Sequence, residues 1–403
     1  MKKTFFAVVS AAALAFASLP AASFAAGKDF AFEYEIKDEQ VTVTGGTGFM
    51  DTINIPSEIE GLPVTAVADS AFAGNEDIIS CTIPDSVKTV GAKAFSNCPK
   101  LGELSIGKGL TAIGDYAFTA CPDLDTIDIS SDNPTYTAFN NSIYDNENTL
   151  VLYGGKQPAA SILYTAKAIG KGAFFGKTNI RMLFIPESIT SIGDYAFSGC
   201  VSLWSVEIPD SVVSLGKGCF ISCNLISDVE LGNSLTAIPE DCFHSCSSLE
   251  KVSLGDNITS IGDDAFYGCT ELKNLYVPPS VTSIGRDAIG RKFDVRSSAS
   301  ENIAGFTIRG EKGSQAEKYA SEYGFSFTEK HFIKGDINDD GYIDAVDASY
   351  VLREYALVSS DQPSSFASEQ KDAADWNGDD IIDAVDASGI LAEYAAIATG
   401  RKV

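Results

Sequence analysis

The chain has 403 residues, with 55 acidic and 29 basic side chains and a net charge of −26 at pH 7. Binding to phosphate backbones needs an excess of Lys and Arg, so this balance argues against nucleic acid as a partner. It argues equally against an anionic membrane surface.

The first 25 residues have the pattern of a targeting segment. Lys2 and Lys3 precede a mostly apolar run over 5–19, and Ser23-Phe24-Ala25 forms a small-x-small cleavage site. This pattern predicts a secretory signal peptide over 1–25, with the mature chain starting near Ala26. No later apolar run is long enough to span a bilayer. We therefore expect a secreted, extracellular protein without membrane insertion.

Residues 26–50 alternate apolar and polar side chains as strands do. They precede the first copy of a repeat that fills the middle of the chain. The first coil of a repeat array has no neighbour on one side, so we expect 26–50 to form an N-terminal cap.

The segment Ile189-Thr-Ser-Ile-Gly-Asp-Tyr-Ala-Phe-Ser-Gly-Cys200 defines that repeat, and it returns almost unchanged at 258–269. One aromatic position marks the phase of each copy, with these members: Phe72, Phe95, Phe118, Phe174, Phe197, Phe220, Phe243, Phe266 and finally Ile289. Neighbouring members are 23 residues apart, except for the interval of 56 from Phe118 to Phe174. A fixed period of this length predicts a solenoid, in which each coil is buried by its neighbours.

Each copy also carries a strand pattern such as Leu249-x-x-Val252-x-Leu254, which is the core of a leucine-rich repeat. Together with the Ile-Gly-x-x-Ala-Phe-x-x-Cys segment, it resembles the bacterial surface-antigen (BspA-like) class of leucine-rich repeat. The resemblance covers 51–290 and implies adhesion or protein binding without fixing a ligand. We expect an α/β solenoid of about ten coils, spaced by about 4.8 Å, with parallel strands and short helical turns.

The nine cysteines share inward-facing positions of the repeat, at Cys81, Cys98, Cys121, Cys200, Cys219, Cys223, Cys242, Cys246 and Cys269. This phase favours a ladder of small buried thiols over a disulfide framework. A bridge between successive coils is not excluded by distance, but parallel side chains would need distortion to reach disulfide geometry.

Two segments break the repeat. An insertion over 130–165 contains two strand-like runs around Asn146-Glu-Asn148, which predicts a β-hairpin that projects from one edge of the solenoid. Residues 291–331 are expected to form the C-terminal cap and linker. Within them, 313–323 has helical spacing and ends at Gly324.

Residues 332–403 carry a second repeat with the spacing of a calcium-binding loop. Oxygen donors occupy positions 1, 3, 5, 9 and 12, and position 7 supplies a backbone carbonyl. The first loop offers Asp336, Asn338, Asp340, Tyr342, Asp344 and Asp347, and the second offers Asp375, Asn377, Asp379, Ile381, Asp383 and Asp386. Because Ca²⁺ takes six to eight hard oxygen ligands, the two loops predict two bound ions.

Each loop is followed by a helix, and no amphipathic helix precedes the first loop. Position 12 is Asp rather than Glu. This arrangement resembles the type I dockerin module of cellulosomes, which implies Ca²⁺-dependent binding to a cohesin module on a scaffolding protein. Asp380 stands where a glycine is expected, so the second site is expected to be weaker or rearranged.

The same resemblance implies that cohesin contacts loop positions 10 and 11 and the exposed face of the helix that follows. The residues concerned are Ala345, Val346, Tyr350, Arg353, Ala384 and Val385. Both halves share Ala-Val, and the resemblance to dockerins implies that either helix can dock after a half-turn rotation. The two helices differ at two of these positions, and these differences would favour one of the two docking orientations. They are Tyr350 against Gly389 and Arg353 against Ala392. An alternative is that Ala-Val only starts each helix.

Outward-facing Met182, Phe184 and Trp204 form a candidate ligand patch on successive strands, unless the nearby insertion or the neighbouring coil covers them. Neither of the two histidines has a partner pattern for catalysis or zinc binding. The sequence thus favours a non-catalytic subunit of a cell-surface complex. Its dockerin would attach to a scaffold, and its solenoid would bind a protein or a polysaccharide. The alternatives are a free adhesin with a structural calcium module, and a glycoside-active enzyme subunit.

Overall fold

The computed structural model describes residues 31–48, 51–255, 257–329, 334–338, 342–366 and 368–399. The predicted signal peptide and the loop ligand Asp340 lie outside these ranges. In the described part of the chain, no helix is long and apolar enough to cross a membrane.

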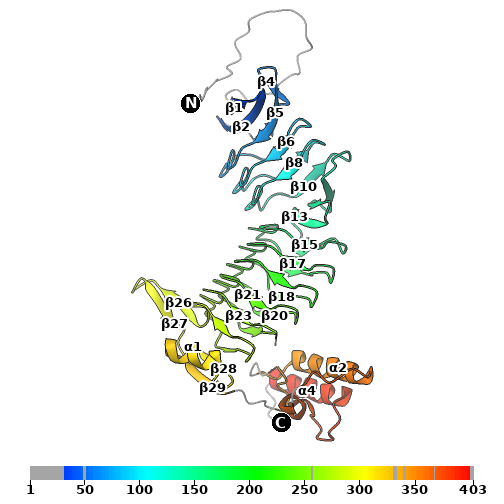
Figure 1. Cartoon of the computed structure of the whole chain (residues 1–403), viewed down its shortest axis with the longest axis vertical. Helices are drawn as coiled ribbons and strands as arrows, with labels where there is room; N and C mark the ends of the chain where they lie inside the picture. The colour runs from blue at the N-terminus through cyan, green and yellow to red at the C-terminus, as the bar shows by residue number, and fades with distance from the viewer. Residues whose placement is uncertain are drawn as a thin grey trace, which may run out of the picture.

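The solenoid is built from coils that each contribute two short strands, one to each side (Figure 1). In the N-terminal half, one sheet has the order β10-β8-β6-β3, and the other runs β1-β2-β5-β7-β9, with β4 paired to β5. The bounds are β1(Ala31–Lys37), β2(Gln40–Thr47), β3(Thr52–Asn54), β4(Glu58–Ile59), β5(Leu62–Val67), β6(Ser80–Ile83), β7(Thr89–Val90), β8(Glu103–Ile106), β9(Ala112–Ile113) and β10(Thr126–Ile129). The antiparallel pair β1–β2 lies beside the first coil, because β2 pairs in parallel with β5.

The C-terminal half repeats this construction. Its strands are β14(Ala159–Ala160), β15(Ala168–Ile169), β16(Met182–Leu183), β17(Ser191–Ile192), β18(Ser205–Glu207), β19(Ser214–Leu215), β20(Asp228–Glu230), β21(Ala237–Ile238), β22(Lys251–Ser253), β23(Ser260–Ile261), β24(Asn274–Tyr276) and β25(Ser283–Ile284). Strands of successive coils pair in parallel with a shift of 23 residues, as in Val206 with Val229 and Val229 with Val252.

The segments between strands are turns, so the expected short helical turns are absent from the described residues between 51 and 293. Two residues in each turn explain the difference. The position two before the phase-marking residue has positive φ in successive coils, for example 54° at Tyr195. The position two after it does as well, as at Ser222 with 60°. Because the residues at both positions adopt the left-handed backbone conformation, the chain turns too tightly there for a helix to form.

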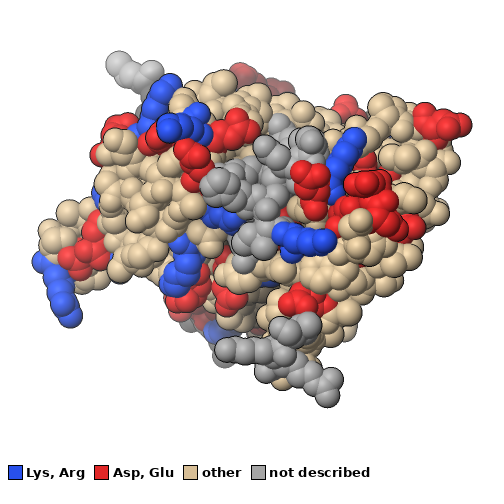
Figure 2. All heavy atoms as spheres, turned by 90° about the horizontal axis from the view of Figure 1, so that it is seen from below, with Lys and Arg blue, Asp and Glu red and all other residues tan. Residues whose placement is uncertain are grey.

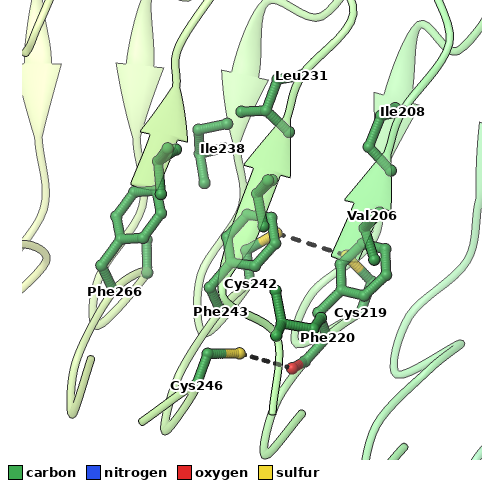
Figure 3. Close-up of a cluster of buried hydrophobic side chains, with 14 of the residues drawn as sticks. Val206, Ile208, Cys219, Phe220, Leu231, Ile238, Cys242, Phe243, Cys246 and Phe266 are labelled. Atoms are coloured by element: carbon green, nitrogen blue, oxygen red, sulfur yellow. Dashed lines mark hydrogen bonds between the residues drawn. The ribbon is translucent and has the colours of Figure 1, made fainter. Parts of the chain in front are cut away.

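The phase-marking rings form two stacks inside the solenoid, one from Phe72 to Phe118 and one from Phe174 to Phe266. Phe220 and Phe243 have centroids 5.4 Å apart and planes 3° apart. All nine cysteines are buried free thiols, in agreement with the predicted ladder. Most donate to the carbonyl of the phase-marking residue of the preceding coil, as Cys246 Sγ does to Phe220 O at 3.2 Å (Figure 3). Cys219 and Cys242 sulfurs lie 3.4 Å apart.

The insertion contains β11(Tyr136–Phe139), β12(Ser142–Asp145) and β13(Thr149–Tyr153), paired antiparallel, so the hairpin prediction is correct. The prediction that it projects is wrong. Ile143 and Leu152 pack into the N-terminal core, whereas Tyr144, Leu150 and Tyr153 pack into the C-terminal core. The hairpin therefore joins the two halves, because its alternating faces are both apolar.

Lys177 occupies the ladder position that cysteine holds in other coils, next to this insertion. It is 2% exposed, and its ammonium donates to Leu124 O at 2.8 Å and Cys121 O at 3.3 Å. Burial lowers its pKa to about 8. The side chain satisfies two carbonyls where the regular stacking of coils is interrupted.

The solenoid ends in β26(Arg291–Asp294), β27(Ala299–Asn302), β28(Thr307–Gly310), α1(Gln315–Tyr323) and β29(Ser326–Glu329). Helix α1 ends at Gly324 with φ 72°, as predicted. The C-terminal module contains α2(Ala345–Ser359), α3(Ser368–Ala374) and α4(Ala384–Ala398). Helix α3, which precedes the second loop, was not predicted. Figure 1 shows this module beside the strand face near β18 and β20.

Candidate metal centre and interaction surfaces

The two loop–helix motifs have the same local geometry. Asp344 is the N-cap of α2, and its Oδ1 accepts from Val346 N at 2.8 Å. Asp347 completes a capping box, because its Oδ2 accepts from Asp344 N at 2.9 Å. Asp383 and Asp386 repeat both bonds at α4. Loop positions 9 and 12 are therefore fixed by the helix starts, and the short Asp side chain at position 12 reaches the backbone of the N-cap residue.

The same position 12 carboxylates also hold the beginning of each loop. Asp347 Oδ1 accepts from Ile337 N at 2.8 Å and Asn338 N at 3.3 Å, and Asp386 Oδ1 accepts from Asn377 N at 3.1 Å. Both carboxylates are fully buried. Each loop is thus closed on itself, with its first residues next to the helix start.

In the second loop, the Asp375 carboxylate accepts from the backbone N–H groups of Gly378 at 2.7 Å and Asp380 at 2.9 Å. Desolvation opposes the ionised form, but these bonds outweigh it and hold the pKa of Asp375 below its usual value. Asp380 has φ 64°, the left-handed conformation that the expected glycine would supply. The loop keeps its sharp bend at this position because Asp tolerates that region better than most residues.

The side chains of the two loops supply the hard oxygen ligands that Ca²⁺ prefers. They are carboxylate and amide oxygens, and Asp336, Asp347 and Asp386 carry carboxylates that are at most 1% exposed. Hydrogen bonds from backbone N–H groups stabilise such buried anions, as at Asp347 and Asp386, and a bound cation would stabilise them further. Across the described residues, no three acidic, His or Cys side chains converge closely enough to hold a metal ion. The structure thus brings together the start and end of each loop, while the complete ligand set remains a prediction.

The helical module has a small core of its own, formed by Ile337, Ala348, Val351, Ala374, Ala387 and Ile390. Trp376 packs against Gly389, where an added Cβ would meet its ring at 2.0 Å. This contact gives a physical reason for the difference between Tyr350 and Gly389. The second helix needs a gap for the indole.

The predicted partner-binding residues are placed asymmetrically. Ala345, Ala384 and Arg353 are exposed, and Tyr350 is half-buried. Val385 is 59% exposed, whereas its counterpart Val346 is half-buried. Lys251 and Ser253 of the solenoid contact the first half of the module. Sequence reasoning missed both, since nothing distinguishes them from other outward positions of the repeat.

The candidate ligand patch lies open. Met182, Phe184 and Trp204 are 58%, 73% and 55% exposed. The insertion does not cover them, contrary to the alternative weighed from the sequence. Charged side chains elsewhere are mixed in sign: on the face shown in Figure 2, acidic and basic groups lie interspersed.

The fold and the paired loops define a leucine-rich-repeat solenoid joined to a helical module with calcium-type loops. Residues 40–151 and 167–293 match the BspA type leucine rich repeat region in 6 copies, and the chain belongs to this family. Residues 334–392 match the dockerin type I domain. Neither is a catalytic family. The gap between the two matched repeat regions coincides with the second half of the insertion.

The solved structures that are similar to this chain include bacterial leucine-rich-repeat proteins. A leucine rich cell surface protein from Faecalibacterium prausnitzii is 23% identical, with 72% of this chain and 95% of that chain covered and a TM-score of 0.36. A leucine-rich repeat protein from Eubacterium ventriosum is 19% identical, with 64% and 91% covered and a TM-score of 0.44. No curated protein matches this chain.

Proposed function

We propose that this chain is a secreted, non-catalytic binding subunit whose dockerin attaches, in a Ca²⁺-dependent manner, to a cohesin of a cell-surface scaffold. The observation that carries the proposal is the exact repetition of the capped loop–helix unit, 39 residues apart, within a match to the dockerin type I domain. The loop residues Asp336, Asp344, Asp347, Asp375, Asp383 and Asp386 would hold two Ca²⁺ ions, which would fix the loops against their helices.

The test is calorimetric titration of the full chain against a panel of cohesins, first with Ca²⁺ and then with a chelator. We expect binding to at least one cohesin that disappears with the chelator. Asp375→Ala and Asp336→Ala remove the first ligand of each loop and should weaken binding, whereas Asp361→Ala, an exposed acid outside the loops, should not. Ca²⁺ binding without binding to any cohesin would favour the free adhesin instead.

We further propose that the solenoid carries the second binding surface at Met182, Phe184 and Trp204. Adjacent exposed aromatic rings can stack on sugar rings or anchor a protein partner. Affinity electrophoresis through gels that contain soluble plant polysaccharides tests the carbohydrate case. Retardation should fall in Trp204→Ala and persist in Val213→Ala, which removes an apolar side chain of similar exposure elsewhere on the solenoid. Equal retardation of both variants would exclude this patch.

A further inference from the structure

The first half of the dockerin rests against the solenoid strand face formed by β18, β20 and β22. The Lys251 ammonium on β22 forms an ion pair with the Asp344 carboxylate at the start of α2, and it lies 4.4 Å from the centroid of the Tyr342 ring. Position 9 of a calcium-binding loop often reaches the ion through a water, so Asp344 can serve the calcium site in this way while it pairs with Lys251. The side chains of Lys251 and Asp344 are only 24% and 11% exposed. A shielded pair of this kind is screened less by salt than an exposed one.

Further contacts follow along α2. Ser253 Oγ lies 3.4 Å from the Tyr350 hydroxyl, and Arg353 Nη2 lies 3.7 Å from Asp210 Oδ2. With the Asn233 amide oriented toward the guanidinium, its oxygen accepts from Arg353 Nη1 at 2.7 Å. Each partner thus supplies a cation to an anion of the other, which is charge complementarity across the contact.

The second half of the dockerin serves as an internal comparison. Both halves carry the sequence Asp-Ala-Val-Asp, yet Asp344 is 8% exposed and Asp383 is half-buried. Three of the differences in sequence between the halves fall on residues that contact the solenoid. These are Tyr342 against Ile381, Tyr350 against Gly389, and Arg353 against Ala392.

We propose that the β18–β20–β22 face is a docking surface for the first half of the chain's own dockerin, so that the full chain presents only the second half to an outside partner. The surface at Ala384 and Val385, with α4, would then be the one that binds cohesin. The two dockerin halves are similar in sequence, but contact with the solenoid makes them unequal in their access to a partner. The partner-facing part of this inference rests on the proposed function, whereas the docking contact does not.

The docking contact is tested directly by cross-linking the full chain in Ca²⁺ with a carbodiimide, which joins an amine to a carboxylate without a spacer. Mass spectrometry should find Lys251 joined to Asp344. Lys273, one coil away and more exposed, should not be joined to the dockerin. Absence of the Lys251–Asp344 product, or equal yields from both lysines, would overturn the inference.

The consequence is tested by binding to a cohesin in two backgrounds. In the wild-type chain, Val385→Asp should weaken binding by at least about tenfold, and Val346→Asp by less than about twofold. An undocked chain carries Lys251→Glu and Asp210→Arg, which repel Asp344 and Arg353. In it, either single Asp substitution should be tolerated, because the other half can bind. Lys273→Glu is the charge control and should behave as wild type.

Equal effects of Val346→Asp and Val385→Asp in the wild-type chain would overturn the inference even where cohesin binds. A cross-link without binding to any cohesin would instead contradict the proposed function, and with it the partner-facing half of the inference, while the docking contact stands. The two failures are therefore distinguishable.

Discussion

Tyr153 of the insertion stacks on Phe174 with ring centroids 4.4 Å apart and planes 23° apart. Phe174 begins the second run of stacked rings, which continues through Phe197 to Phe266. The insertion thus supplies the ring that the repeat lacks between Phe118 and Phe174. The second run of stacked rings therefore starts with a residue from outside the repeat pattern.

Replacing Tyr153 with Ala should reduce the free energy of unfolding by about 3–5 kcal/mol, because it leaves a cavity at the end of the ring stack. Tyr164→Ala is the matched control. It removes a 78% exposed ring from the same insertion and should change stability by less than about 0.5 kcal/mol. Urea unfolding followed by circular dichroism gives both values. Similar small losses in the two variants would show that the insertion does not support the solenoid.

The coils could be predicted from the sequence alone, because their pattern is local and recurs with a fixed period. The phase of Phe220 and Cys223 alone placed both side chains inside, and the two calcium-type loops were each predicted to be followed by a helix. The sequence alone was not sufficient for the insertion. Tyr144 and Leu152 alternate as in any hairpin, and only the structure shows that both faces meet a core.

The contact between dockerin and solenoid could not be predicted from the sequence, for a different reason. Lys251 occupies an outward strand position where charged residues are ordinary, and its partner Asp344 is 93 residues away in the chain. A long-range ion pair leaves no periodic signal in one sequence. The differences between the two dockerin halves were the only local trace of it.

The thiol ladder predicts loss of stability at alkaline pH. Burial raises the pKa of Cys200 and of Cys246 to about 12, from 9.0 for a free thiol. A group whose pKa is raised on folding favours the folded state fully below its unfolded pKa, and this contribution is lost as pH rises. The free energy of unfolding should therefore fall progressively between pH 9 and pH 12.

Urea unfolding at a series of pH values measures this slope, and Cys200→Ala with Cys246→Ala should make it shallower. A thiol reagent should not react with the native chain at pH 8 and should react after unfolding. A pH dependence that is identical in the double variant would mean that other groups cause the alkaline loss.

Removing Ca²⁺ should unfold the dockerin and leave the solenoid folded, because in small metal-binding modules the binding free energy is folding free energy. The two tryptophans separate the two parts: Trp204 lies on the solenoid and Trp376 in the dockerin core. In the Trp204→Phe variant, a chelator should shift the fluorescence of Trp376 and lower the melting temperature of the dockerin, which that fluorescence reports. In Trp376→Phe, the melting curve of Trp204 should not move. A single cooperative transition whose midpoint is unchanged by the chelator would contradict this prediction.

Gly389 should be intolerant of alanine although it lies within a helix, where Gly→Ala ordinarily stabilises by about 1 kcal/mol. A Cβ at this position would meet Trp376 Cδ1 at 2.0 Å, so the indole would have to leave its place in the core. We expect Gly389→Ala to destabilise the dockerin by about 1–3 kcal/mol, the usual cost of overpacking. The neighbouring Ser388→Ala, at an exposed position, should be neutral or slightly stabilising.

The measurement is thermal unfolding of both variants in Ca²⁺, followed by Trp376 fluorescence in the Trp204→Phe background. A lower melting temperature in Gly389→Ala than in Ser388→Ala supports the packing argument, and the emission maximum should move toward longer wavelength as the indole meets water. If Gly389→Ala melted higher, helix propensity would dominate and the indole would have room elsewhere. The difference between Tyr350 and Gly389 would then owe nothing to the packing of Trp376.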